Sequence, residues 1–149
     1  MPQNPSPASA ALPTEARPTS KIQAVGIVIP VRNHAHAIAK CIGKLFAANS
    51  YCGWRNWLWI VVVADASTDD TAKIARHALG AFGQVLEVSA QSRQAAYRLG
   101  AAAVMDHFRE VPRHSLLMVS RDATAELPLD WIDQQLKTSQ SPVGLNSAY

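Results

Sequence analysis

The sequence predicts an α/β fold in which a mostly parallel β-sheet is flanked by helices. Short runs of β-branched and other apolar residues are continuous rather than alternating, as is typical of strands buried on both faces. Between these runs, apolar residues recur at helical spacing. The chain therefore alternates strands with helices, which is the pattern of βαβ units.

The first half of the chain predicts two strands and two helices. Residues 24–29 form an apolar run that we expect Pro30 to end. A second strand covers residues 57–63 and stops at Ala64 and Asp65. The helix after the first strand, about three turns long, is indicated by apolar residues at helical spacing, namely Ile38, Cys41, Ile42, Leu45 and Phe46.

Capping chemistry marks the start of the next helix. Residues 67–71 carry hydroxyl and carboxylate groups suited to free backbone N–H groups, and the helix ends near Gly80. The second half continues the alternation, with strands at 85–88 and 115–119 and helices at 92–107 and 128–137.

Composition sets the domain organisation. The chain has 149 residues, of which 48% are hydrophobic and 17% charged, so one domain with a sizeable core is expected. Residues 1–20 hold five of the nine prolines and are expected to form a disordered tail. We expect the folded domain at residues 21–138 and a flexible tail at residues 139–149.

Charge and cysteine content limit the kinds of binding partner and the cellular compartment that we expect for this protein. The net charge is +3, but Lys and Arg are scattered, which argues against a nucleic-acid surface. No apolar run approaches the ~20 residues that span a bilayer, and the N-terminus lacks signal-peptide features. Cys41 and Cys52 are too few for a disulfide framework or a four-ligand zinc site. We expect reduced thiols in a cytoplasmic protein.

Polar residues follow three of the predicted strands. Because open parallel sheets bind ligands at the carboxyl ends of their strands, these residues are expected to converge on one edge. They are Arg32, Asn33, Asp65, Ser120, Arg121 and Asp122. Charges gathered there are costly to desolvate unless a charged ligand meets them, and a divalent cation would suit such a ligand.

Each cluster also fits a purely structural role. Asp65 could be a turn residue, Arg32 and Asn33 could begin a helix, and Asp122 could pair with Arg121. Recurrence at one sheet edge favours a ligand site. The glycine-rich phosphate loops GxxxxGK[ST] and GxGxxG do not occur after a strand, which disfavours ATP hydrolysis and dinucleotide redox chemistry.

Several segments resemble the signatures of family 2 glycosyltransferases. Residues 27–33 resemble the opening apolar strand that ends in Pro-x-x-Asn, and residues 61–72 resemble VVxDGSTDDTA. Residues 93–100 are similar to a segment rich in Arg, Ala and Gly. Residues 122–131 resemble an Asp-x-Asp followed by a Pro and an Asp-Trp pair. Order and spacing match over roughly residues 22–136.

The resemblance implies a GT-A-like (Rossmann-like) fold, incomplete here, whose residues 21–138 bind a nucleoside diphosphate sugar. It implies inverting transfer of the sugar to an unknown acceptor. The nucleotide-sugar-binding residues would be Pro30, Arg32, Asn33, Asp65, Arg93 and Arg98. Of these, Asp65 would contact the base, and the two last arginines would lie beside the diphosphate. Asp122 would hold Mg²⁺ or Mn²⁺.

The chain departs from the family pattern in ways that bear on catalysis. His34 and Ala35 stand where two acidic residues usually follow the Asn. Thr124 stands at the second Asp of Asp-x-Asp, and sliding the alignment puts Ser120 first instead, so one carboxylate is lost either way. The acceptor-binding half of the family lies beyond the Asp-Trp helix, where only residues 138–149 follow here. The catalytic base is therefore unassigned.

These departures leave two hypotheses open. The chain is either a family 2-like glycosyltransferase or a truncated or degenerate, non-catalytic module that binds nucleotide or a partner. Trp54, Trp57 and Trp59 are expected to pack in the core or between subunits of a homodimer, rather than to form a sugar platform. His34 and His36 are expected to be solvated, because residues two apart on a helix do not face each other.

Overall fold

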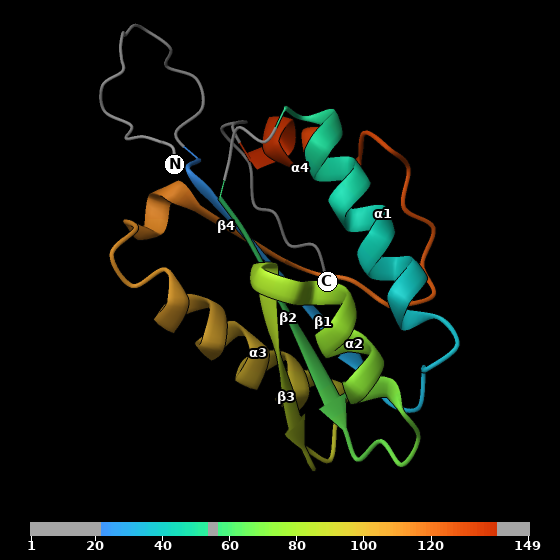
Figure 1. The fold of residues 1–149 in the computed structure, drawn as a ribbon. Helices are drawn as coiled ribbons and strands as arrows, with labels where there is room; N and C mark the ends of the chain where they lie inside the picture. Colours follow the sequence, from blue (N-terminus) through green and yellow to red (C-terminus); the bar gives the residue numbers. More distant parts are fainter. Residues whose placement is uncertain (1–21, 54–56, 140–149) are drawn as a thin grey trace, which may run out of the picture.

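The computed structural model describes residues 22–53 and 57–139 of the chain. Within them, parallel strands form one four-stranded sheet in the order β3-β2-β1-β4, with helices packed on both faces (Figure 1). The predicted α/β class is confirmed. The tails expected at residues 1–20 and 139–149 lie outside the described residues, apart from Ser139.

Each predicted strand and helix is present, with shifted bounds. The strands are β1 (Ala24–Val31), β2 (Trp57–Asp65), β3 (Gly83–Val88) and β4 (Leu116–Ser120). The α-helices are α1 (Ile38–Tyr51), α2 (Thr71–Leu79), α3 (Arg93–His107) and α4 (Trp131–Ser139). Short 3-10 turns at Gly80–Phe82 and Arg113–Ser115 lead into β3 and β4. None of the helices in the described ranges is long and apolar enough to cross a membrane.

β1 lies between β2 and β4 and continues past its proline. The prediction that Pro30 ends this strand is wrong, because β1 extends to Val31. Pairing with β4 stops at Val28 and Ser120, and the Val28 carbonyl accepts a hydrogen bond from the Arg121 amide at 3.0 Å. Backbone groups two residues apart point to the same side of a strand. The N–H that Pro30 lacks would face the side where β4 has ended, so no ladder bond is lost.

The larger apolar core lies between the sheet and the helices α1, α2 and α4 (Figure 1). Ile27 and Ile29 of β1 point into it and are fully buried. The predicted apolar face of α1 packs against them through Ile38, Cys41, Ile42 and Leu45. Burial of one such aliphatic side chain stabilises the fold by roughly 1.5–3 kcal/mol, so this layer fixes the strands rigidly.

α3 covers the opposite face and approaches the sheet closely. A Cβ added to Gly100 would lie 2.4 Å from Cγ1 of Val28 and 2.9 Å from Cγ2 of Val63. A Cβ added to Gly26 of β1 would lie 2.2 Å from Cγ1 of Val104. Only glycine fits at these two positions, and the absence of a Cβ there lets α3 pack closely against β1 and β2. The first residue of α3, Arg93, is thereby kept at the carboxyl edge of the sheet.

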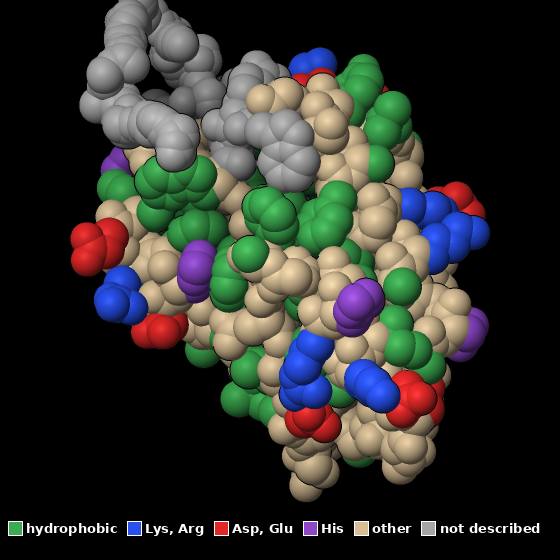
Figure 2. Space-filling view, in the orientation of Figure 1, with side chains coloured by type: hydrophobic (Ala, Val, Ile, Leu, Met, Phe, Trp, Pro, Cys, Tyr) green, Lys and Arg blue, Asp and Glu red, His purple; other side chains and the backbone are tan. Residues whose placement is uncertain are grey.

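Chain order brings the carboxyl ends of the strands together. From β1 the chain passes to β2 and β3 on one side, and then crosses to β4 on the other side of β1. Strand order therefore reverses between β1 and β4, which is where open α/β sheets bind ligands. Figure 2 shows basic and acidic side chains next to one another at the end of the molecule toward which the strand arrows of Figure 1 point.

Candidate functional site

A cleft of about 370 Å³ opens at the carboxyl edge of the sheet. Its walls come from the end of β1, the end of β2 and the connection between β3 and α3. It contains four of the residues predicted to bind nucleotide sugar, Pro30, Arg32, Asp65 and Arg93. His34, Gln91 and Ser92 also line it.

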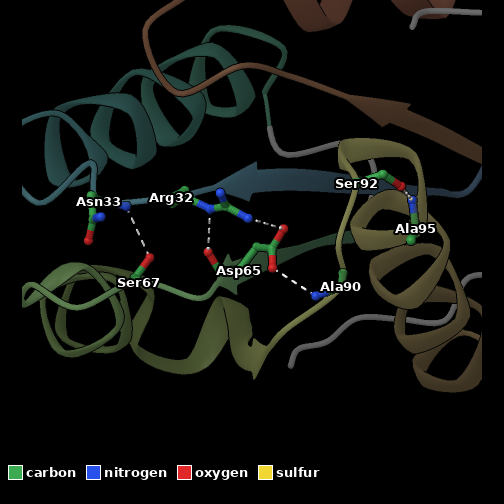
Figure 3. A network of polar contacts seen from close by, with 7 residues as sticks. All are labelled: Arg32, Asn33, Asp65, Ser67, Ala90, Ser92 and Ala95. Carbon is green, nitrogen blue, oxygen red and sulfur yellow. Dashed lines mark hydrogen bonds and ion pairs between the residues drawn. The ribbon is translucent and has the colours of Figure 1, made fainter.

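Asp65 is the buried polar residue that joins three strand ends. It is only 6% exposed. Its Oδ1 accepts a hydrogen bond from the Ala90 amide at 2.8 Å, beyond the end of β3. Arg32, beyond the end of β1, donates from Nε to the Asp65 carbonyl at 3.1 Å and lies 3.4 Å from its Oδ2 (Figure 3). This carboxylate is therefore held in place from both neighbouring strands.

Asn33 fixes the connection between β2 and α2. Its Oδ1 accepts hydrogen bonds from the amides of Thr68 at 2.8 Å and Asp69 at 3.2 Å. The backbone N–H of Asn33 donates to Ser67 Oγ at 3.1 Å (Figure 3). The His34 amide adds a bond to Thr71 Oγ1 at 2.9 Å. Asn33 thus supports the loop beside the cleft, and its side chain is outside the cleft lining.

Left-handed backbone conformations follow three strand ends. Asn33, Ala66 and Gln91 have φ of 55°, 54° and 71°, and they follow β1, β2 and β3 respectively. In the described part of the chain, these are the non-glycine residues with positive φ. Such conformations cost free energy in L-residues and cluster at ligand sites. Ala66 stands where the VVxDGSTDDTA signature, which residues 61–72 resemble, has Gly. A left-handed conformation costs more free energy in alanine than in glycine.

A second cleft, of about 540 Å³, adjoins the first and shares Arg93 with it. Asp122 lines this second cleft. Its Oδ1 accepts hydrogen bonds from the Thr124 amide at 2.8 Å and from Thr124 Oγ1 at 2.7 Å, and its Oδ2 lies 3.5 Å from the Arg93 guanidinium. The hydrogen bonds from Thr124, and secondarily the charge of Arg93, lower the pKa of the Asp122 carboxyl. Asp122 is therefore held as an anion.

Arg121 is the other cation of the second cleft. Its guanidinium lies 4.8 Å from the centre of the Trp131 ring and donates to the Glu126 carbonyl at 3.2 Å. Its Nε is buried and has no hydrogen-bond partner in the described part of the chain. Stacking on Trp131 orients the guanidinium without neutralising its charge.

Arg98 and the two histidines lie outside the arrangement that the sequence predicts. Arg98 is exposed on α3 and lines neither of these clefts, because it is five positions from Arg93 on the helix. The expectation that His34 and His36 do not face each other is wrong. Their rings stack with centroids 5.9 Å apart, since residues 35–37 form a turn before α1 rather than helix.

Sequence reasoning did not assign His34, Gln91 or Ser92 to the cleft. The Ser92 side chain accepts a hydrogen bond from the Ala95 amide at 3.0 Å and caps α3 (Figure 3). Serine just before an alanine-rich helix is a signal from which this cap could be found. Gln91 and His34 carry no comparable signal, because their positions depend on loop conformation.

Metal-ligating side chains are dispersed over residues 22–53 and 57–139. Within these ranges, no three His, Cys, Asp or Glu side chains gather closely enough to hold a metal ion. Cys41 is buried, and burial raises the pKa of its thiol to about 11. Such a thiol is unreactive at neutral pH. Cys41 forms no disulfide in the described part of the chain.

Trp57 and Trp59 lie at the amino edge of the sheet, opposite the two clefts. Trp57 is 53% exposed, whereas Trp59 is half-buried and stacks on His107 with ring centroids 3.6 Å apart. Both line a pocket of about 540 Å³ at the amino end of β2, together with Phe82. Trp54 lies outside the described residues. These rings are therefore remote from the carboxyl edge.

No protein-family model matches this chain, and no curated protein matches it.

Proposed function

We propose that this chain binds a nucleoside diphosphate sugar at the carboxyl edge of its sheet, as a family 2 glycosyltransferase-like protein. The observation that carries the proposal is the buried Asp65 carboxylate, held by Arg32 and Ala90 in a cleft that Arg93 also lines. Fold and cleft agree, because open parallel sheets bind nucleotides at this edge.

The chemistry of the cleft suits both parts of such a ligand. Asp65 Oδ1 accepts one protein hydrogen bond and its Oδ2 faces one guanidinium, so each oxygen keeps a lone pair for a base N–H. The Arg32 and Arg93 side chains are 57% and 58% exposed, so they can reach phosphate oxygens. Guanidinium binds phosphate through two parallel N–H groups, which favours arginine here.

Transfer would proceed with inversion at the anomeric carbon. An acceptor oxygen would bond to that carbon as its bond to the diphosphate breaks, and the acceptor proton would pass to a base. The resemblance implies Mg²⁺ or Mn²⁺ beside Asp122. The described donor set does not fit such an ion, because both oxygens of this carboxylate face donors from Thr124 and Arg93. No step is assigned to a metal.

A second candidate function is a non-catalytic nucleotide-binding or partner-binding module. The ion pairs that the carboxylates of the two clefts form with arginines favour this second function. Asp65 and Asp122 each lie within 3.5 Å of an arginine. A carboxyl group whose pKa is lowered, as that of Asp122 is, accepts a proton poorly at neutral pH. Sugar release from a bound donor distinguishes the enzyme from the module.

Two further proposals concern location and assembly. We propose a cytoplasmic location, because the Cys41 thiol is buried and forms no disulfide, which suits a reducing compartment. A homodimer would use the exposed Trp57 and Phe82 at the amino edge. Size-exclusion chromatography of the chain and of Trp57→Ser tests the dimer, which the substitution is expected to dissociate.

Calorimetric titration with UDP- and GDP-sugars tests the nucleotide proposal. We expect the wild type to bind at least one of them. Asp65→Asn removes the charge that fixes Arg32 and should weaken binding about tenfold or more. The matched control is Asp106→Asn, an 82% exposed carboxylate at the far end of α3, which should bind as the wild type does. Absence of binding by the folded wild type would contradict the proposal.

A further inference from the structure

The linings of the two clefts carry three guanidinium groups and two carboxylates. Arg32 pairs with Asp65 at 3.4 Å, and Arg93 pairs with Asp122 at 3.5 Å. Arg121 lines the second cleft, and its contacts in the described residues are a carbonyl and a ring rather than a carboxylate. The two adjoining clefts therefore present a net positive charge before any ligand binds.

Asp122 is poorly placed to coordinate a divalent cation together with the diphosphate of a bound nucleotide. Both lone pairs of its Oδ1 are used by the Thr124 amide and hydroxyl. A cation on Oδ2 would lie beside the Arg93 guanidinium, 3.5 Å away, and like charges so close repel strongly. Thr124 stands where the Asp-x-Asp motif that this segment resembles has its second carboxylate. Its hydroxyl donates to Asp122.

We infer that Arg93 and Arg121 neutralise the diphosphate in place of a divalent cation, so that binding at this edge is independent of Mg²⁺ and Mn²⁺. The inference rests on the proposed nucleotide site. Arg93 can do this because it lines both clefts and its side chain is 58% exposed. Arg93 exchanges Asp122 for phosphate oxygens when the ligand enters. Arg121 lines the same second cleft, where stacking on Trp131 orients it.

Titration with UDP, GDP and inorganic pyrophosphate, in EDTA and in Mn²⁺, tests the inference. The wild-type Kd should agree within about threefold between the two conditions. Arg93→Gln should weaken binding in EDTA roughly tenfold or more, because a charge-assisted bond is lost. The matched control is Arg109→Gln, which removes an arginine that pairs with Asp106 away from the clefts. Asp122→Asn frees Arg93 and should leave binding in EDTA intact or tighter.

The outcomes separate this inference from the proposed function. Mn²⁺ that tightens UDP or GDP binding about tenfold or more, with the gain lost in Asp122→Asn, overturns the inference and leaves the nucleotide site standing. Equal effects of Arg93→Gln and Arg109→Gln also overturn it. Cation-independent binding of pyrophosphate without binding of UDP or GDP supports the role of the arginines and contradicts the nucleotide proposal. Binding of none of the three probes contradicts both.

Discussion

Ala66 directly follows Asp65 and adopts a left-handed backbone conformation, with φ of 54°. Its side chain is exposed and makes no core contact, so the conformation is imposed by its neighbours. The Ala66 amide donates to the Val88 carbonyl at 2.7 Å, while Asp65 is bonded to Arg32 and Ala90. Strain at Ala66 is thus the cost of turning the chain where Asp65 is held.

Replacing Ala66 with glycine is expected to stabilise the protein. Ala66→Gly removes the clash of Cβ in the left-handed region, and it also loosens the unfolded chain. The net gain in the free energy of unfolding should be roughly 0.5–1 kcal/mol, measured by urea denaturation. Ala47→Gly, at an exposed position within α1, should instead cost about 1 kcal/mol. Destabilisation by both substitutions would contradict the assigned strain at Ala66.

The sequence predicts which residues lie at the carboxyl edge better than it predicts which side chains contact one another there. The position of Asp65 after a buried strand predicts it at the carboxyl edge of the sheet, and the structure places it there. The bond from Thr124 to Asp122 and the stacking of His34 on His36 depend on turn conformations. Spacing along the chain does not encode these conformations, because several turn types suit the same residues.

Strands and helices follow from hydrophobic periodicity, and their ends follow from local contacts that periodicity does not contain. β1 runs through Pro30 because its pairing with β4 has already ended. α4 begins at Trp131 rather than at Pro128, because Pro128 to Asp130 form the turn whose carbonyl, that of Pro128, accepts from the Trp131 amide at 3.0 Å. The spacing between α3 and the sheet is set by Gly26 and Gly100, which a periodic pattern does not distinguish from other small residues.

Two glycine substitutions within helices should have opposite effects. In Gly100→Ala the new methyl group would meet Val28 and Val63 of the sheet, and overpacking should cost roughly 1–3 kcal/mol of the free energy of unfolding. Gly43→Ala in α1 meets nothing within 4 Å, so helix propensity alone should raise that free energy by about 1 kcal/mol. Guanidinium denaturation measures both. A neutral Gly100→Ala would show that α3 does not approach the sheet this closely.

At the scale of the whole molecule, the order of the strands decides where chemistry can occur. β1, β2 and β4 end at one edge, and the connection after β3 closes the cleft from the side. Chain alternation predicted the parallel sheet and the convergence of the strand ends. The pairing of the charges there could not be predicted, because it depends on which loop presents Arg93 to Asp122. That pairing is what favours cation-independent binding.

The central claim is that a nucleoside diphosphate binds at the carboxyl edge, and amide chemical-shift mapping by NMR with added UDP or GDP tests it most directly. We expect the largest shifts at Arg32, Asp65 and Ala90, whose amides lie around the cleft. Residues at the amino edge, such as Trp57 and Trp59, should be unaffected. Shifts concentrated around the two tryptophans, with none at Asp65, would contradict the account.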